Sequence, residues 1–197
     1  MAIDDSDISY LYNTLKGRMA ESLFEEIGKN LDLDISRCGQ ETKFPELLRS
    51  RARVRMSSYT IIRELPDFLW KTRDRDWFVE VRYRKNPYLV KEKISRHYFD
   101  DTAYVLFSPS GIFAAFPDEI NEHMVNGRYT FNVRWEDHPR FAWTTQQVES
   151  IKCMRRLAIH VLGRLPEQKE TFKETYVHVH SFTPRMLDTM TKARVAG

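Results

Sequence analysis

Hydrophobic residues near the start of the chain recur at steps of three and four. This spacing predicts a helix from Ser6 or Asp7 to about Lys29, with an apolar face of Ile8, Leu11, Tyr12, Leu15, Met19, Leu23 and Ile27. A second stripe combines small residues with one acid: Gly17, Ala20, Glu21, Phe24 and Gly28. Because small residues let another surface approach closely, we expect this helix to pack on two sides.

Alternating and continuous apolar runs downstream predict strands at 31–38, 59–70, 77–84, 103–107, 112–116, 129–135 and 175–182. The polar segment 71–76 and the turn residues 108–111 predict two β-hairpins. Helices are expected at 88–99, 145–162 and 184–195, with a helical turn at 118–124 and a capping box at 144–147. Strands and helices mix without strict alternation, so we expect an α/β domain with a mixed central β-sheet flanked by helices.

Composition narrows the class of protein. The chain has 197 residues, 42% of them hydrophobic and 13% aromatic, which fits one globular domain spanning 1–197. Two distant cysteines, Cys38 and Cys153, fit a reduced, cytoplasmic protein and disfavour a disulfide framework or structural zinc. No apolar run approaches the roughly 18 residues of a membrane span, so no membrane partner is expected. A net charge of only +3 does not by itself indicate nucleic acid.

Two carboxylates inside apolar strands are the most informative chemistry. Asp67 and Glu80 lie 13 positions apart across the predicted turn, and opposed strands would bring them close together. Neighbouring carboxylates repel, and their pKa values rise unless a cation compensates them. Mg²⁺ or Mn²⁺ suits such oxygen ligands. The simpler alternative is that Asp67 is a turn residue and Glu80 pairs with a nearby arginine.

Basic residues cluster locally in two places. Four arginines at every second position would share one face of a strand and could follow a phosphate backbone: Arg49, Arg51, Arg53 and Arg55. A solvated strand edge that discourages aggregation is the alternative. Arg84 and Lys85 follow the second carboxylate and extend the possible nucleic-acid contact, with Arg84 on the face of Arg82 and Lys85 on the other.

Taken in order, these segments resemble the PD-(D/E)xK nuclease superfamily, and in layout its archaeal Holliday-junction resolvases. The helix motif K-G-x-x-A-E is matched by Lys16, Gly17, Ala20 and Glu21. Asp67 follows Pro66 as the superfamily's name requires, and Glu80 precedes the apolar Val81. The resemblance covers roughly residues 10–108.

The resemblance implies a restriction-endonuclease-like αβββαβ core at about 6–116, with a C-terminal α+β extension at about 117–197. It implies that Asp67, Glu80 and the Val81 carbonyl hold Mg²⁺ or Mn²⁺, that Glu21 completes the catalytic site, and that Lys16 contacts nucleic acid. The expected activity is endonucleolytic hydrolysis of DNA, with branched DNA and RNA as alternative substrates. A homodimer is also possible.

One position departs from the family pattern. Arg82 stands where the family has lysine, and arginine cannot lose a proton to act as a base. Three alternatives stay open: the chemistry tolerates Arg82, another lysine (Lys16 or Lys91) substitutes for it, or the protein binds without cutting. The last would make the chain a catalytically inactive nuclease-fold protein that binds nucleic acid or a protein partner. A structural module whose acids merely pair with Arg63, Arg82 or Arg84 is a further alternative.

Overall fold

The structure is a computed structural model that describes residues 5–38, 65–72, 75–90 and 102–164. The chain divides into two compact units. One unit is Gly17–Gly163, and it contains every strand described below. The other joins Met1–Lys16 to Arg164–Gly197, and only residues 5–16 and 164 of it are described.

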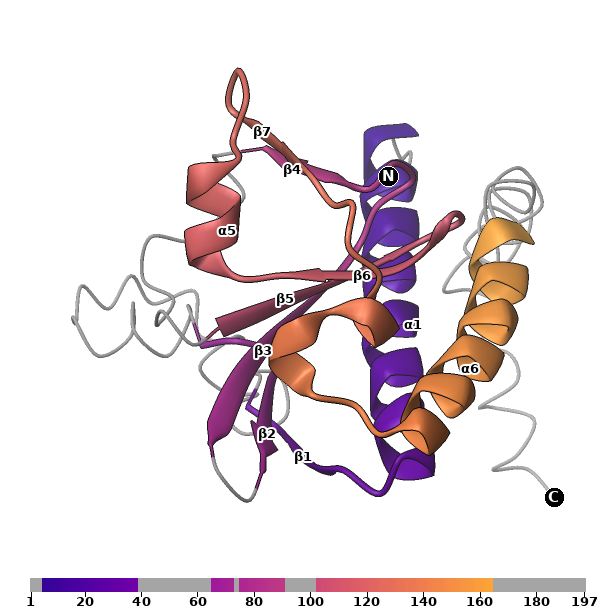
Figure 1. Cartoon of the computed structure of the whole chain (residues 1–197). Coiled ribbons are helices and arrows are strands. Elements are labelled where there is room, and N and C mark those ends of the chain that lie inside the picture. Colours follow the sequence, from indigo (N-terminus) through magenta and orange to yellow (C-terminus); the bar gives the residue numbers. More distant parts are fainter. Residues whose placement is uncertain (1–4, 39–64, 73–74, 91–101, 165–197) are drawn as a thin grey trace, which may run out of the picture. The chain divides into compact units, whose positions relative to one another are not determined.

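A five-stranded sheet forms the centre of the larger unit, in the order β1-β2-β3-β5-β6 (Figure 1). The strands are β1 (Asp34–Arg37), β2 (Phe68–Lys71), β3 (Asp76–Tyr83), β5 (Thr102–Ser108) and β6 (Gly111–Ala115). β3 and β5 are parallel, whereas the other neighbouring pairs are antiparallel. The mixed sheet and both predicted hairpins are therefore confirmed.

Aromatic packing covers one face of this sheet. Helix α1 (Asp5–Asn30) places Phe24 with its ring centroid 5.0 Å from that of Phe68 on β2. Two 3₁₀ turns, η2 (Trp135–Asp137) and η3 (Pro139–Phe141), add further rings to this face. The ring contacts join Trp70, Trp77, Trp135, Phe141 and Trp143 into one cluster. Trp70, Trp77 and Trp135 are buried and Trp143 is half-buried, so all four pack in the core or at its edge.

A second, smaller layer covers the opposite face. It consists of helix α5 (Pro117–Glu122) and a two-stranded sheet of β4 (Tyr88–Val90) and β7 (Arg128–Thr130). Its buried side chains Leu89, Ile120, Tyr129 and Phe131 pack against Tyr104, Leu106, Phe113 and Ala115 of the main sheet. The sheet is therefore flanked by helices on both faces.

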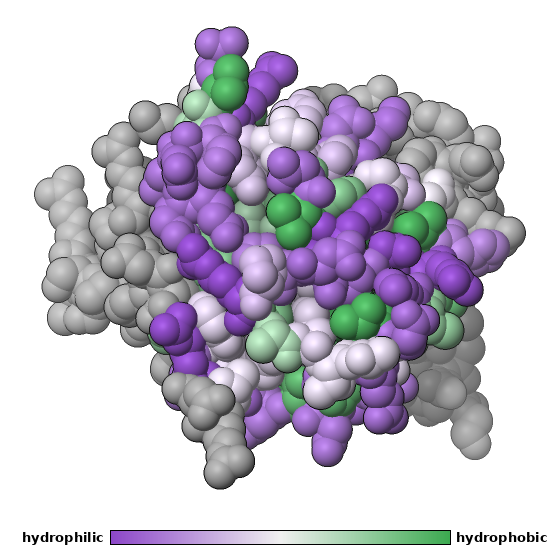
Figure 2. All heavy atoms as spheres, viewed as in Figure 1, coloured by the Kyte–Doolittle hydropathy of each residue, from purple (hydrophilic) through white to green (hydrophobic). Residues whose placement is uncertain are grey.

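Helix α6 (Thr145–Arg164) closes the described chain. Its predicted capping box is confirmed: the Gln147 amide donates to Thr144 Oγ1 over 3.2 Å, and the Thr144 amide donates to Gln147 Oε1 over 3.0 Å. Further along the helix, Arg155 forms an ion pair with the buried Glu136 of η2. On the face shown in Figure 2, hydrophilic residues predominate and apolar ones are scattered. None of the helices that the structure describes has the length and apolar character needed to cross a membrane.

Two predicted elements differ from the structure. Residues 88–90 form strand β4 rather than the start of a helix, because Leu89 is buried opposite Tyr129 of β7. The strand predicted at 129–135 ends at Thr130, since the chain leaves β4 and approaches β6, where the Ala114 amide donates to the Val133 carbonyl over 3.2 Å. The elements predicted at 175–182 and 184–195 lie outside the described residues.

Candidate active site

Asp67 directly precedes β2, at the end of that strand where its pairing with β3 stops. Phe68 opposite Val79 is the last residue pair of this ladder toward Asp67. Beyond it, the Val81 amide donates to Asp67 Oδ2 over 2.8 Å, so the carboxylate replaces a strand as the partner of β3. The Asp67 carbonyl accepts a hydrogen bond from the Cys38 amide over 2.9 Å. Asp67 is therefore fixed through both its main chain and its side chain.

Glu80 is the most deeply buried acid of this region, with 3% of its surface exposed. It forms an ion pair with Arg82, whose side chain is 39% exposed. The two residues are separated by Val81 on one strand, so they share a face of the sheet. The pairing with arginine that the sequence offered as the simpler alternative is therefore present.

The negative charges of the Asp67 and Glu80 carboxylates repel each other. Burial is the main cause that raises the pKa of Asp67, to about 7, and the negative charge of Glu80 raises it further. The hydrogen bond from Val81 and the charges of Arg82 and Arg37 oppose this shift without cancelling it. The expectation that the hairpin brings the two acids together is thus met.

Glu21 projects from α1 toward Arg37 on β1. Arg37 Nη1 donates to Glu21 Oε2 over 3.1 Å, and Arg37 Nε donates to Glu25 Oε2 over 2.9 Å. Burial disfavours the charged guanidinium, but these two acids outweigh that effect and raise the pKa of Arg37. The guanidinium also lies 5.0 Å from the centre of the Phe68 ring, next to Asp67 in sequence.

Arg37 is the site residue that the sequence did not suggest. It bonds Glu21 and acts electrostatically on Asp67, and so it links the helix to the acid pair. Within the described ranges, no group of three or more His, Cys, Asp or Glu side chains is placed to hold a metal ion. Glu21 therefore does not form a metal-holding cluster with Asp67 and Glu80, but Arg37 bonds Glu21 and acts on Asp67.

The remaining candidate residues are distributed unevenly. Arg84 is half-buried and interacts electrostatically with Arg82, and Lys85 is exposed. Lys16 belongs to the smaller unit, where its ammonium lies 4.5 Å from the centre of the Tyr12 ring. The other expected cations lie outside the described residues: Arg49, Arg51, Arg53, Arg55, Arg63 and Lys91.

The donors gathered here are hard oxygen atoms. Two carboxylates adjoin the main chain of Val81, whose amide faces Asp67. The amide and carbonyl of one strand residue point toward the same strand edge, so the Val81 carbonyl also faces the gap beside β3. This donor set suits Mg²⁺ or Mn²⁺, which take carboxylate and carbonyl oxygens and retain several waters.

Comparison with models of protein families, with curated proteins and with solved structures finds no match for this chain.

Proposed function

We propose that this protein is an Mg²⁺- or Mn²⁺-dependent endonuclease that hydrolyses DNA at Asp67 and Glu80. The observation that carries the proposal is the pair formed by the buried Glu80 and the half-buried Asp67, in which the pKa of Asp67 rises to about 7 chiefly through desolvation. Burying two interacting carboxylates costs free energy, and folded proteins retain such pairs most readily where they serve a site. A divalent cation between them would remove that penalty.

The order of elements supports a restriction-endonuclease-like core. Helix α1 precedes the antiparallel strands β1, β2 and β3, and β5 then lies parallel to β3. This is the helix–strand–strand–strand succession, followed by a parallel strand, that the superfamily resemblance implies. Asp67 lies just beyond the last β2–β3 residue pair, Phe68–Val79, and Glu80 follows Val79 on β3, where β3 still pairs with β5.

Each residue of the site then has a role. Asp67, Glu80 and the Val81 carbonyl would hold the cation, which would supply Lewis-acid chemistry: a water of lowered pKa and compensation of the charge on the scissile phosphate. Arg82 neutralises Glu80 and is exposed enough to bind a phosphate oxygen through its planar guanidinium. Glu21 positions Arg37, which favours the ionised form of Asp67.

The experiment compares DNA cleavage by the wild type and two variants. Asp67→Asn keeps the size of the side chain and should abolish cleavage in Mg²⁺ or Mn²⁺. Asp76→Asn makes the same charge change at an exposed position on β3 and should leave cleavage unchanged. Equal cleavage by the wild type and Asp67→Asn would refute the proposal.

A second candidate function is nucleic-acid binding without catalysis. Two observations favour it. The ion pair with Arg82 neutralises Glu80, one of the proposed metal ligands, and Arg82 itself occupies the position where the family has lysine. Calorimetry with Mn²⁺ separates the two functions. The endonuclease requires binding that Asp67→Asn removes, whereas the binding protein requires salt-sensitive DNA affinity with no Mn²⁺ binding at this site.

A further inference from the structure

A pocket opens in the layer that covers the same face of the sheet as Glu80 and Arg82. Glu80 and Arg82 stand opposite Tyr104 and Leu106 in the β3–β5 register, so all four share this face. Tyr104 and Leu106 are covered by the β4–β7 layer, including Tyr129. The pocket and the acid pair therefore lie on one side of the sheet.

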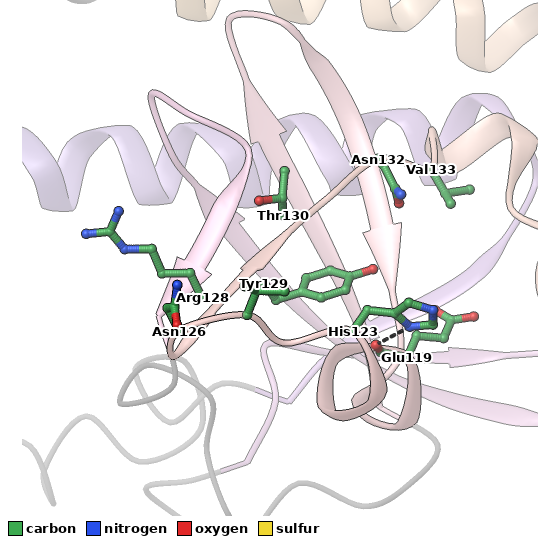
Figure 3. A pocket seen from close by; sticks show the side chains of 9 residues that line it. Glu119, His123, Asn126, Arg128, Tyr129, Thr130, Asn132 and Val133 are labelled. Carbon is green, nitrogen blue, oxygen red and sulfur yellow. Dashed lines mark hydrogen bonds between the residues drawn. The ribbon is translucent and has the colours of Figure 1, made fainter.

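The β7 pocket, as we name it, has a volume of about 830 Å³ (Figure 3). Figure 3 shows the Tyr129 ring reaching across it between Asn132 and His123, while Arg128 points away from that ring. This volume falls within the roughly 300–1,000 Å³ of small-ligand sites. The residues that give it its chemistry are His123, Asn126, Arg128, Tyr129, Thr130 and Asn132.

The lining offers hydrogen bonds more than charge. Two asparagine amides, a threonine hydroxyl and a tyrosine phenol can each donate and accept. Glu119 also lines the pocket, but its carboxylate already accepts from the Phe116 amide over 2.9 Å and contacts His138 Nε2 at 3.1 Å. A ligand with a planar hydrogen-bonding edge and one negative charge fits this combination.

Arginines connect the pocket to the acid pair. The guanidinium of Arg128 lies 5.4 Å from the centre of the Tyr88 ring, and Tyr88 pairs with Thr130 of the pocket. Tyr88 also acts on Arg84: burial and then the charge of Arg82 lower the pKa of Arg84, and Tyr88 opposes that lowering. Arg82 is paired with Glu80, Arg84 interacts with Arg82 and Tyr88, and Arg128 lies over the Tyr88 ring, so these contacts link the acid pair to the pocket.

We propose that the β7 pocket receives one unpaired nucleobase of the DNA strand held at the acid pair, with Arg84 and Arg128 on its phosphates. The inference rests on the proposed function, because it takes the nucleic acid bound there as the ligand. Asparagine amides recognise base edges, and a base can present its edge to a pocket only when it leaves the stack. The substrate class is accordingly single-stranded or locally unpaired DNA rather than continuous duplex.

The test measures DNA binding by fluorescence anisotropy in EDTA, where metal-dependent cleavage cannot occur. Labelled single strands carry an abasic site at each position in turn. Asn132→Ala should weaken binding of the intact strand about tenfold, and an abasic site at one position should remove that difference. Asn121→Ala, at an exposed position of α5 outside the pocket, is the control.

Arg128→Ala provides an independent variant, because Arg128 is exposed and its loss spares the core. It should reduce the slope of log K against log salt by about 0.7, the value for one phosphate of a single strand. Arg156→Ala, exposed on α6, should leave the slope unchanged. The inference would be overturned if Asn132→Ala weakened binding equally whichever position carried the abasic site. It would also be overturned if the protein bound continuous duplex as tightly as the single strand.

The two proposals fail separately. Suppose that cleavage depends on Asp67 but no abasic site removes the effect of Asn132→Ala. That result would refute the β7 pocket as a nucleobase site and keep the endonuclease. Suppose instead that one abasic site removes the effect of Asn132→Ala but no metal-dependent cleavage occurs. That result would refute the endonuclease and keep the pocket as a nucleobase site.

Discussion

Replacing Asp67 with asparagine should make the protein more stable above neutral pH. In the folded protein burial and Glu80 raise the pKa of Asp67 from its ordinary 3.8 to about 7. Between these values the folded state holds a proton that the unfolded state has released. Stability therefore falls as pH rises through this window, because folding takes up a proton.

The size of the effect follows from the shift. One pKa unit corresponds to about 1.4 kcal/mol, so a shift of about three units amounts to about 4 kcal/mol once Asp67 is fully ionised. Asparagine has the shape of the protonated acid and can still accept from the Val81 amide, but it carries no charge. Asp67→Asn should accordingly exceed the wild type in stability by about 2–4 kcal/mol at pH 8 and match it near pH 4.

Urea unfolding in EDTA across pH 4–8 measures this difference. Asp76→Asn removes an exposed carboxylate from the same hairpin and should follow the wild type at each pH. If the wild type loses no stability relative to Asp67→Asn as pH rises, the acid pair is not electrostatically strained and the reasoning fails.

Three further predictions concern the same site and the helix beside it. Mn²⁺ binding at pH 6 should release about one proton in the wild type, because Asp67 is then protonated; calorimetry in two buffers of different ionisation enthalpy measures this, and no release contradicts it. Arg82→Lys should preserve or raise DNA cleavage, since lysine can act on the attacking water; loss of cleavage with intact Mn²⁺ binding would show that the guanidinium itself is needed. Gly28→Ala should leave the protein about 1 kcal/mol less stable than Gly17→Ala does, because its Cβ would come within 2.3 Å of Ile35 Cδ1 and that side chain would have to move. Gly17→Ala, whose Cβ would meet no atom of the described residues within 4 Å, should stabilise the protein by about 0.5–1 kcal/mol. Thermal unfolding measures both variants, and equal effects of the two changes would contradict this.

The sequence predicted the elements whose patterns are local. The 71–76 turn and the alternation around it determine the β2–β3 hairpin, and Thr144 with Gln147 determines the start of α6. The stripe of small residues on α1 indicated a close approach, which within the described part of the chain is found at Gly28 and not at Gly17. Leu15, placed on the apolar face by its spacing, is 39% exposed.

What the sequence did not give depends on tertiary contacts. Arg37 is an unremarkable strand residue until α1 brings Glu21 and Glu25 to it. The β7 pocket is formed by α5 together with the segment that follows it, and no spacing within either segment indicates it. The helix expected at 88–99 was wrong over 88–90 because Leu89 is buried opposite Tyr129 on a strand distant in sequence.

The position of β3 between a hairpin partner and a parallel partner has a consequence for the order of folding. β2 and β3 are joined by a short turn and can pair quickly, whereas β5 begins at Thr102, far along the chain from Tyr83. Closing that longer loop costs entropy before its contacts form, so the parallel pairing comes later. Asp67 and Glu80 can thus meet while water still surrounds them, and their mutual repulsion becomes severe only as β5 and its covering layer exclude that water.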